Sequence, residues 1–239
     1  MDILILVGGR GSRLQSIIND RPKPMALFQK KPFLDLLIDF ICKQGGNRII
    51  LCAGHKGSFI KDYYQKHTEY AREIICSYED IPLGTAGAIK YAEPFIKTDP
   101  FLVMNGDSFC PFDLNRLTSF HSENASFLTI LLASLDMRTD CGNVIINQHG
   151  IVTHFAEKQT TQLPEETTWM NGGVYVFQKE ILDYIPYNKP YSIELQLVPS
   201  LILKKPCYGF TTTGKVIDIG TPERFTLAQQ MLSEGLLPK

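Results

Sequence analysis

Short apolar runs alternate with amphipathic stretches along the first half of the chain. The apolar runs have the length of buried strands, and the stretches between them repeat hydrophobic residues at helical spacing. We expect strands at residues 3–7, 48–53, 73–78 and 101–104, and helices at residues 32–44, 58–66 and 85–96. Strands and helices in this alternation are typical of a parallel sheet covered by helices. The pattern therefore predicts an α/β protein.

Strands follow one another more quickly in the second half of the chain. We expect them at residues 126–135, 143–147, 151–156, 173–177 and 216–219, with helices at residues 192–203 and 222–233. Thr221 and Pro222 favour a helix start, because a hydroxyl can cap the first turn and proline fits its first position. No repeat, low-complexity tract or linker divides the sequence. We expect one domain, residues 1–239, with a mixed and mostly parallel central sheet.

The charge balance argues against a nucleic-acid-binding protein. The 239 residues carry 24 basic and 25 acidic side chains, a formal net charge of −1. Proteins held on DNA by phosphate contacts have a basic excess or a basic face, whereas the pairs Lys30-Lys31 and Lys204-Lys205 are short and typical of solvated surface. The opening apolar run, residues 3–7, is far too short to span a membrane. We expect no nucleic acid and no membrane as partner, and a homodimer stays open.

Six cysteines lie at positions 42, 52, 76, 110, 141 and 207. Their spacings do not match those of zinc sites or redox motifs. The even number permits disulfides, but no signal peptide directs the chain to an oxidising compartment. We therefore expect a protein of the reducing cytoplasm.

A glycine-rich loop directly follows the first expected strand and reads Gly8-Gly9-Arg10-Gly11-Ser12-Arg13-Leu14. Glycines let the backbone approach a ligand closely and direct amide N–H groups toward phosphate oxygens. The loop is not a dinucleotide-binding fingerprint, because Leu14 stands in the place of the third glycine. It is not a P-loop either, because no Gly-Lys-Ser/Thr follows. A tight turn without a ligand is the alternative.

Two cations belong to this part of the chain. Arg13 lies in the loop itself, and Lys23 follows within Arg21-Pro22-Lys23-Pro24-Met25. We expect the two prolines to hold the backbone around Lys23 extended and stiff, so that its ammonium group loses little freedom on binding. A fixed cation beside a phosphate-binding loop is what a phosphoryl-type transfer needs.

These two motifs resemble the signature of the sugar-1-phosphate nucleotidyltransferase family. The resemblance continues in family order over most of the chain, at residues 82–88, 105–107, 155–158, 171–175 and 218–223. The doubled glycine, the loop at residues 82–88 and the short length are most similar to the heptose-1-phosphate guanylyltransferases. Gln159 and Cys141 depart from the proline and tyrosine that are commoner in the family. Both positions border the sugar, so they weaken the choice of sugar more than the reaction class.

The resemblance implies a Rossmann-like, three-layer α/β fold and a role for each motif. It implies that Arg13 and Lys23 are catalytic residues and that Asp107 and Asp218 are ligands of a Mg²⁺ ion. The residues that it places at the nucleotide are Gly8, Gly9, Gly11, Gly84 and Thr85. The residues that it places at the sugar phosphate are Asn105, Gly142, Glu157, Lys158, Asn171 and Gly172.

Taken singly, each of these residues has a simpler interpretation. Asp107 and Asp218 could cap a turn or a helix, Lys158 and Glu157 could be surface residues, and Asn171 could belong to a β-bulge. Both aspartates nevertheless end expected strands, where open α/β sheets bind ligands. Two carboxylates together with phosphate oxygens and water suit the octahedral Mg²⁺ ion. The five histidines show no ligand spacing, and we expect them to be incidental.

Glu79 indicates which nucleobase the nucleotide substrate carries. It lies five residues before Gly84, where uridylyl- and thymidylyltransferases of the family generally have glutamine. An ionised carboxylate accepts hydrogen bonds and donates none. Guanine offers two neighbouring donors, N1–H and the 2-amino group, whereas uracil offers one donor flanked by carbonyls and cytosine one donor beside an acceptor. Guanine therefore fits Glu79 best, and an exposed loop acid without a ligand is the alternative.

We therefore expect an enzyme that transfers GMP from GTP to a sugar 1-phosphate and releases pyrophosphate. The expected sugar is D-glycero-D-manno-heptose 1-phosphate, for the synthesis of cell-surface glycans. Arg13 would hold the β- and γ-phosphates, Lys23 would stabilise charge on the α-phosphoryl group, and Lys158 would position the sugar phosphate. The alternatives are a mannose-1-phosphate guanylyltransferase, a uridylyltransferase and a non-catalytic sensor of nucleotide sugars. A nicotinamide oxidoreductase is disfavoured by Leu14 and by the lysine turn.

Overall fold

The computed structural model describes residues 1–9, 11–14, 17–18, 20–66, 73–135, 142–156 and 168–234. Nine strands form the main sheet: β1 (Asp2–Leu6), β4 (Arg48–Ala53), β5 (Glu73–Tyr78), β6 (Phe101–Asn105), β8 (Leu128–Ala133), β9 (Asn143–Ile146), β10 (Val152–Ala156), β11 (Thr168–Phe177) and β12 (Cys207–Thr212). Two short ribbons pair β2 (Leu27–Phe28) with β3 (Lys31–Pro32), and β7 (Ser108–Phe109) with β13 (Ile217–Asp218).

The sheet is mixed, as expected. β5, β4, β1 and β6 lie in this order and are parallel, because a helix returns the chain to the same end after each strand. β11 then runs antiparallel to β6 and pairs with both β8 and β9, while β12 is parallel to β8. Among the described residues the sheet has four parallel and four antiparallel pairings, and β11 makes three of the antiparallel ones, so the sheet is mixed but not mostly parallel.

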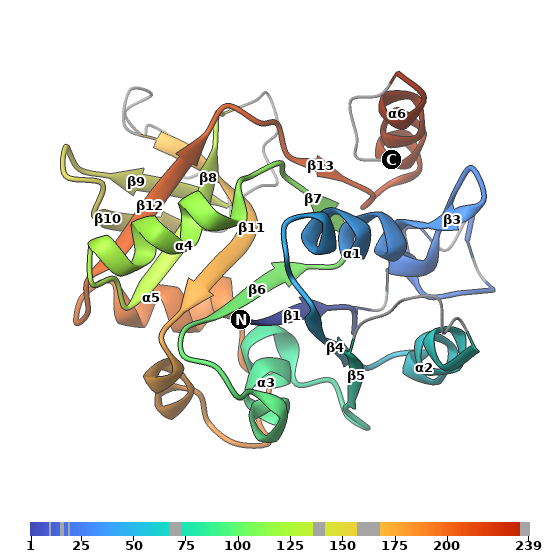
Figure 1. Cartoon of the computed structure of the whole chain (residues 1–239), viewed down its shortest axis with the longest axis horizontal. Helices are drawn as coiled ribbons and strands as arrows, with labels where there is room; N and C mark the ends of the chain where they lie inside the picture. Colours follow the sequence, from blue (N-terminus) through green and yellow to red (C-terminus); the bar gives the residue numbers. More distant parts are fainter. Residues whose placement is uncertain are drawn as a thin grey trace.

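Helices cover both faces of this sheet and make three layers (Figure 1). The helices are α1 (Phe33–Lys43), α2 (Gly57–Lys66), α3 (Gly84–Tyr91), α4 (Leu114–Glu123), α5 (Val198–Leu201) and α6 (Pro222–Ser233). Ile3 and Ile5 of β1 point into a core shared with α1, α2, α4 and α6. Leu4 points to the other face, into a core shared with α3 and α5. Alternate residues of a strand face opposite sides, so β1 is apolar at every position from Ile3 to Leu6.

Several elements differ from the expectation. The helix expected at 85–96 ends at Tyr91, and a 3₁₀ turn follows at Glu93–Phe95, because Pro94 cannot continue an α-helix. The helix expected at 192–203 is a π-helical turn, Ile193–Leu197, followed by the short α5. The pattern misses α4 and β12 altogether. Among the described residues no helix is long and apolar enough to cross a membrane.

Candidate active site

Two adjoining cavities open at the carboxyl ends of the parallel strands, where open α/β sheets bind ligands. The first has a volume of about 380 Å³, and its lining includes Gly8, Gly9, Glu79, Gly84 and Thr85. The second has a volume of about 290 Å³, and its lining includes Arg13, Lys23, Gly142, Asn171 and Asp218. Three residues line both cavities: Thr85, Asn105 and Asp107. Ligands in the two cavities would therefore meet at these residues.

The glycine loop forms one wall of the first cavity. The loop ends in a single 3₁₀ turn, Ser12–Leu14, and the buried Leu14 anchors that turn in the core. A Cβ atom added at Gly8 would lie 3.1 Å from the backbone nitrogen of Gly54. A Cβ atom at Gly9 would meet none of the described atoms within 4 Å. The loop therefore packs closely at Gly8 and leaves its backbone accessible at Gly9.

The backbone at Lys23 is helical, not extended. Pro22 is extended, but Lys23–Met25 forms a 3₁₀ turn in which the N–H of Met25 donates to the carbonyl of Pro22 at 2.8 Å. Pro24 fits the first turn, where no partner is needed for its missing N–H. Gly11, with φ of 59°, packs against this turn, and a Cβ atom there would lie 2.9 Å from the Cβ of Lys23.

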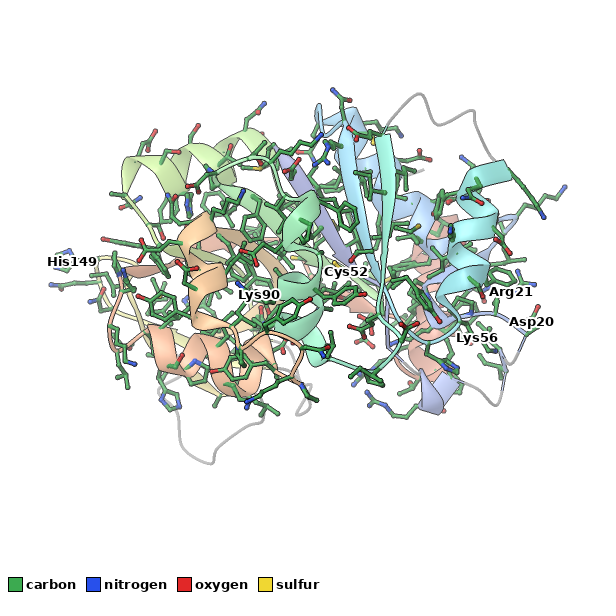
Figure 2. The ribbon with its side chains drawn as sticks, turned by 90° about the horizontal axis from the view of Figure 1, so that it is seen from below. Asp20, Arg21, Cys52, Lys56, Lys90 and His149 are labelled. Carbon is green, nitrogen blue, oxygen red and sulfur yellow. The ribbon has the colours of Figure 1, made fainter. Side chains whose placement is uncertain are left out.

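The side chains of Arg21 and Lys23, the two cations on either side of Pro22, point in different directions. The Nζ of Lys23 donates a hydrogen bond of 2.7 Å to the Oδ2 of Asp107 in the second cavity. Arg21 instead binds its neighbour Asp20 at 2.6 Å, and both lie beside Lys56 at the edge of the molecule (Figure 2). The turn therefore directs only Lys23 toward the site.

The strands β7 and β13 pair (Figure 1). Asp218 lies in β13 opposite Ser108, and Asp107 directly precedes β7, so this pairing brings the two aspartates together. The N–H of Ile219 donates to the carbonyl of Asp107 at 3.0 Å, which ties the two turns together. Each carboxylate has a cationic partner. Lys23 binds Asp107, and the guanidinium of Arg224, from the first turn of α6, lies 3.2 Å from Asp218.

Gly220 marks the point where these charges converge. A Cβ atom there would lie 2.8 Å from the Oδ1 of Asp218, 3.6 Å from the Nζ of Lys23 and 3.9 Å from a guanidinium nitrogen of Arg13. Two cations and a carboxylate therefore surround one small residue, and a larger side chain would displace them.

The donor set fits a magnesium ion that binds together with phosphate. Asp107 and Asp218 offer hard oxygen ligands in one cavity, beside cations that suit phosphate. The described residues contain no group of three or more His, Cys, Asp or Glu able to hold a metal. The remaining positions would fall to substrate oxygens and water, the usual arrangement for Mg²⁺.

Glu79 is a buried carboxylate, only 8% exposed, in the wall of the first cavity. Its Oε1 packs against glycine, 2.8 Å from where a Cβ of Gly54 would be. Its Oε2 is buried and has no hydrogen-bond partner among the described residues. Burial raises the pKa of Glu79, and a backbone hydrogen bond from Leu83 opposes this rise. The alternative of an exposed loop acid is wrong, and the buried acceptor still needs a donor.

Asn171 is fixed by hydrogen bonds within the second cavity. Its side-chain amide donates to the hydroxyl of Tyr175 at 2.7 Å and accepts from the N–H of Gly173 at 3.0 Å. The pairing of β11 with β8 shifts register between Asn171 and Tyr175, so Asn171 does belong to a β-bulge, the alternative interpretation of this residue, and it lines the cavity as well. The N–H of Asn171 donates to the carbonyl of Gly142 at 2.8 Å. The bulge thereby holds two expected sugar residues together.

The first turn of α3 is covered by the segment around Tyr191. Gly84 has φ of 72°, and a Cβ atom there would lie 2.8 Å from the carbonyl oxygen of Tyr191. That oxygen accepts from the N–H groups of Ala86 and Gly87 at 2.9 and 3.0 Å, and the N–H of Tyr191 donates to Leu83. These two amide groups of α3 are therefore hydrogen-bonded within the protein.

The same segment brings Glu194 to the second cavity. The hydroxyl of Thr85 donates to the Oε2 of Glu194 at 3.0 Å and accepts from the N–H of Ile193 at 2.7 Å. The hydroxyl of Ser192 donates to the same Oε2 at 2.9 Å. Thr85 therefore supports Glu194 as well as lining both cavities.

Comparison with known proteins identifies the family. The family model described as nucleotidyl transferase matches residues 3–235. The chain is also 33% identical, over 232 residues, to the D-glycero-alpha-D-manno-heptose 1-phosphate guanylyltransferase of Aneurinibacillus thermoaerophilus. The aligned region covers 97% of this chain and 98% of that protein. The chain belongs to the nucleotidyl transferase family.

Other members of the nucleotidyl transferase family show the same relationship. The mannose-1-phosphate guanylyltransferase catalytic subunit beta of Drosophila melanogaster is 32% identical over 99% of this chain, which spans 64% of that longer protein. The crystal structure of HddC from Yersinia pseudotuberculosis, complexed with GMP-PN, superposes with a TM-score of 0.82 at 34% identity. The match covers 97% of this chain and 99% of that one. The expected three-layer nucleotidyltransferase fold is confirmed.

In this nucleotidyl transferase most of the expected residues line the two cavities. They are Gly8, Gly9, Arg13, Lys23, Glu79, Gly84, Thr85, Asn105, Asp107, Gly142, Asn171 and Asp218. Gly11 instead packs against Lys23, and Gly172 packs against Leu131, while Gly173 takes the place at the cavity. Glu157 and Lys158 lie outside the described residues.

Among the described lining residues that the sequence interpretation did not single out are His55 in the first cavity and Glu194 and Arg224 in the second. His55 lines the first cavity although histidine spacing gives no sign of a role. Glu194 comes from a segment that the pattern predicts as plain helix. Arg224 stands only six residues after Asp218, within the expected last helix, and this proximity is the one signal that could have revealed it.

Proposed function

We propose that the chain transfers GMP from GTP to a sugar 1-phosphate and releases pyrophosphate. The observation that carries this proposal is the junction of the two cavities. Lys23 and Asp107 lie there, so a nucleotide in the first cavity and a sugar phosphate in the second would meet beside a cation and a metal ligand. Preorganised charges at a reacting phosphoryl group are the main source of catalysis in such transfers.

In the proposed reaction an oxygen of the sugar phosphate attacks the α-phosphorus of GTP. The new P–O bond forms as the bond to the β-phosphate oxygen breaks, and pyrophosphate leaves. Arg13 binds the leaving phosphates, and Lys23 turns from Asp107 to the α-phosphoryl oxygens. A Mg²⁺ ion held by Asp107 and Asp218 would neutralise charge on the phosphates of both substrates. The protein contributes mainly position and electrostatics.

Glu79 supports guanine as the base. Its carboxylate lies in the wall of the first cavity, one of its oxygens is buried without a hydrogen-bond partner among the described residues, and guanine brings two adjacent donors. The relatives support the same choice, since both the bacterial and the fly protein are guanylyltransferases. D-glycero-D-manno-heptose 1-phosphate is the preferred sugar, because the heptose enzyme matches over nearly its full length. Mannose 1-phosphate is the second candidate.

We also propose that the enzyme works in the reducing cytoplasm. Among the described cysteines, Cys52, Cys76 and Cys207 are free thiols, which suits a reducing compartment.

A pyrophosphate-release panel tests the proposal. GTP, ATP, CTP and UTP are each combined with D-glycero-D-manno-heptose, D-mannose and D-glucose 1-phosphates in the presence of Mg²⁺. We expect the highest kcat/KM for GTP with the heptose 1-phosphate, and loss of turnover with EDTA. A preference for UTP with glucose 1-phosphate would overturn both the base and the sugar. Binding of a nucleotide sugar without pyrophosphate release from any pair would favour the sensor.

A further inference from the structure

Glu194 presents a fixed carboxylate to the second cavity. Its Oε2 accepts hydrogen bonds from the hydroxyls of Thr85 and Ser192 at 3.0 and 2.9 Å. Thr85 is itself held by the N–H of Ile193 at 2.7 Å. The structure gives the Oε1 of Glu194 no partner among the described residues. One oxygen is therefore anchored, and the other is available to a ligand.

The chemistry of this oxygen favours a sugar hydroxyl as its partner. A carboxylate accepts hydrogen bonds and donates none, and it repels phosphate. The phosphates have their own binding groups in the same cavity, the cations Arg13 and Lys23. Asn105 and Asn171, the expected sugar residues, line the cavity together with Glu194. The remaining donors that a sugar 1-phosphate brings are the hydroxyls of its ring.

We propose that Glu194 accepts a hydrogen bond from a ring hydroxyl of the sugar and thereby determines which sugar 1-phosphate is used. The proposal rests on the proposed function. Anchoring by two hydroxyls preorganises the carboxylate, and a sugar that lacks the matching hydroxyl leaves a desolvated acceptor without a donor. Sites of this kind reject deoxy analogues strongly.

Glu194→Gln tests the proposal with little disturbance of the fold. The amide oxygen can keep both hydroxyl bonds, while the amide nitrogen replaces the accepting Oε1. The matched control is Glu180→Gln, which changes an exposed carboxylate paired with Lys205 at 2.8 Å. Both variants and the parent protein are assayed with GTP and D-mannose 1-phosphate, and with its 2-, 3-, 4- and 6-deoxy analogues. Poor substrates are measured as competitive inhibitors.

For the parent protein and Glu180→Gln, we expect one deoxy analogue to lose about 10- to 100-fold in kcat/KM, the range of a hydrogen bond to a charged group. In Glu194→Gln, kcat/KM for D-mannose 1-phosphate should fall by a similar factor. The same deoxy analogue should then have a kcat/KM only slightly lower than that of D-mannose 1-phosphate. The dissociation constant of GTP should stay the same in all three proteins. A thermal melt shows whether each variant is folded, and Glu194→Asp, which keeps the charge but withdraws it, replaces Glu194→Gln if the amide does not fold.

The outcomes separate this inference from the proposed function. If the parent protein turns over and the deoxy series falls by the same factors in Glu194→Gln, Glu194 only braces the segment and the inference is overturned. If the parent protein releases no pyrophosphate from GTP with any sugar 1-phosphate, the proposed function itself fails.

Discussion

At the scale of single residues, the site combines paired charges with unpaired acceptors. Lys23 binds Asp107 and Arg224 binds Asp218, whereas a buried oxygen of Glu79 has no partner in the described part of the chain. Ion pairs in a partly exposed cleft contribute little to stability, so a bound phosphate can replace one partner at small cost. The buried oxygen of Glu79 costs more, and a ligand donor would offset that cost.

Glu79→Gln should change the base preference. The amide replaces one acceptor with a donor, so one hydrogen bond to guanine becomes a contact between two donors, whereas uracil offers a donor and a carbonyl. We expect kcat/KM for UTP relative to GTP to rise by about 2–4 kcal/mol in free energy. Steady-state kinetics with GTP, UTP and dTTP measure the change. An unaltered GTP preference would show that Glu79 does not read the base.

Lys23→Ala should lower kcat by about 100-fold or more, because a preorganised cation at the reacting phosphoryl group is lost. The Kd for GTP should change much less, since the role lies in the transition state. Arg21→Ala is the matched control, because Arg21 binds Asp20 at the edge of the molecule. A loss of affinity with unchanged kcat would make Lys23 a binding residue.

Asp107→Ala and Asp218→Ala should each abolish turnover while the protein stays folded, because each removes a ligand from a metal site with few protein ligands. Circular dichroism and pyrophosphate release measure the two properties. Asp62→Ala, an exposed carboxylate of α2, serves as the control. Near-normal activity in Mg²⁺ would remove the changed aspartate from the metal site.

At the scale of elements, the segment around Tyr191 links α3 to the second cavity. Its backbone pairs with Leu83, Ala86 and Gly87, and three residues later the chain presents Glu194. A side chain at Gly84 would push this segment away. The left-handed conformation of Gly84 and its close contact therefore serve the position of the whole segment.

Gly84→Ala should destabilise the protein more than Gly45→Ala. Both glycines have positive φ, 72° and 91°, so each alanine costs about 1–2 kcal/mol of backbone strain. Only Gly84 adds a clash, since a Cβ at Gly45 meets none of the described atoms within 4 Å. Urea unfolding should show the larger loss, together with lower activity, for Gly84→Ala. Equal losses would mean that the contact with Tyr191 is unimportant.

At the scale of the whole molecule, helices cover both faces of the sheet. The protonation of a polar group buried between these layers makes the stability of the protein depend on pH. His121 of α4 is fully buried, with its Nδ1 2.9 Å from the hydroxyl of Thr129 in β8. Burial lowers the pKa of His121 to about 4, and the charge of Asp99 opposes this shift. The folded protein therefore disfavours a proton that the unfolded chain accepts near pH 6.5.

The free energy of unfolding should consequently fall as the pH drops from 6.5 to about 4. The pKa shift of His121 corresponds to a loss of about 3 kcal/mol in the free energy of unfolding. The loss accumulates over this pH range because a proton on His121 favours the unfolded chain. Urea titrations of the parent protein, His121→Asn and the exposed control His149→Asn isolate the contribution. The His121 variant should lose part of the pH dependence, and an identical slope in all three proteins would contradict the assignment.

The sequence by itself determined the elements whose signal is local. The strands expected at 48–53 and 73–78 and the helix expected at 222–233 match β4, β5 and α6 residue for residue. An apolar run between polar turns, or a threonine cap before proline, acts within a few residues and can be seen in one dimension. The glycine loop and the two aspartates were predicted through the family motifs they belong to, and Glu79 also through the hydrogen-bonding chemistry of a carboxylate.

The tertiary structure alone decided how these residues meet. Lys23 and Asp107 are 84 positions apart, and Asp107 and Asp218 come together only because two very short strands, β7 and β13, pair. Glu194 reaches the cavity through hydrogen bonds to Thr85, from which it is separated by 109 positions. Such contacts depend on the packing of whole layers, and no local pattern of apolar and polar residues encodes the distance between segments that only the folded core brings together.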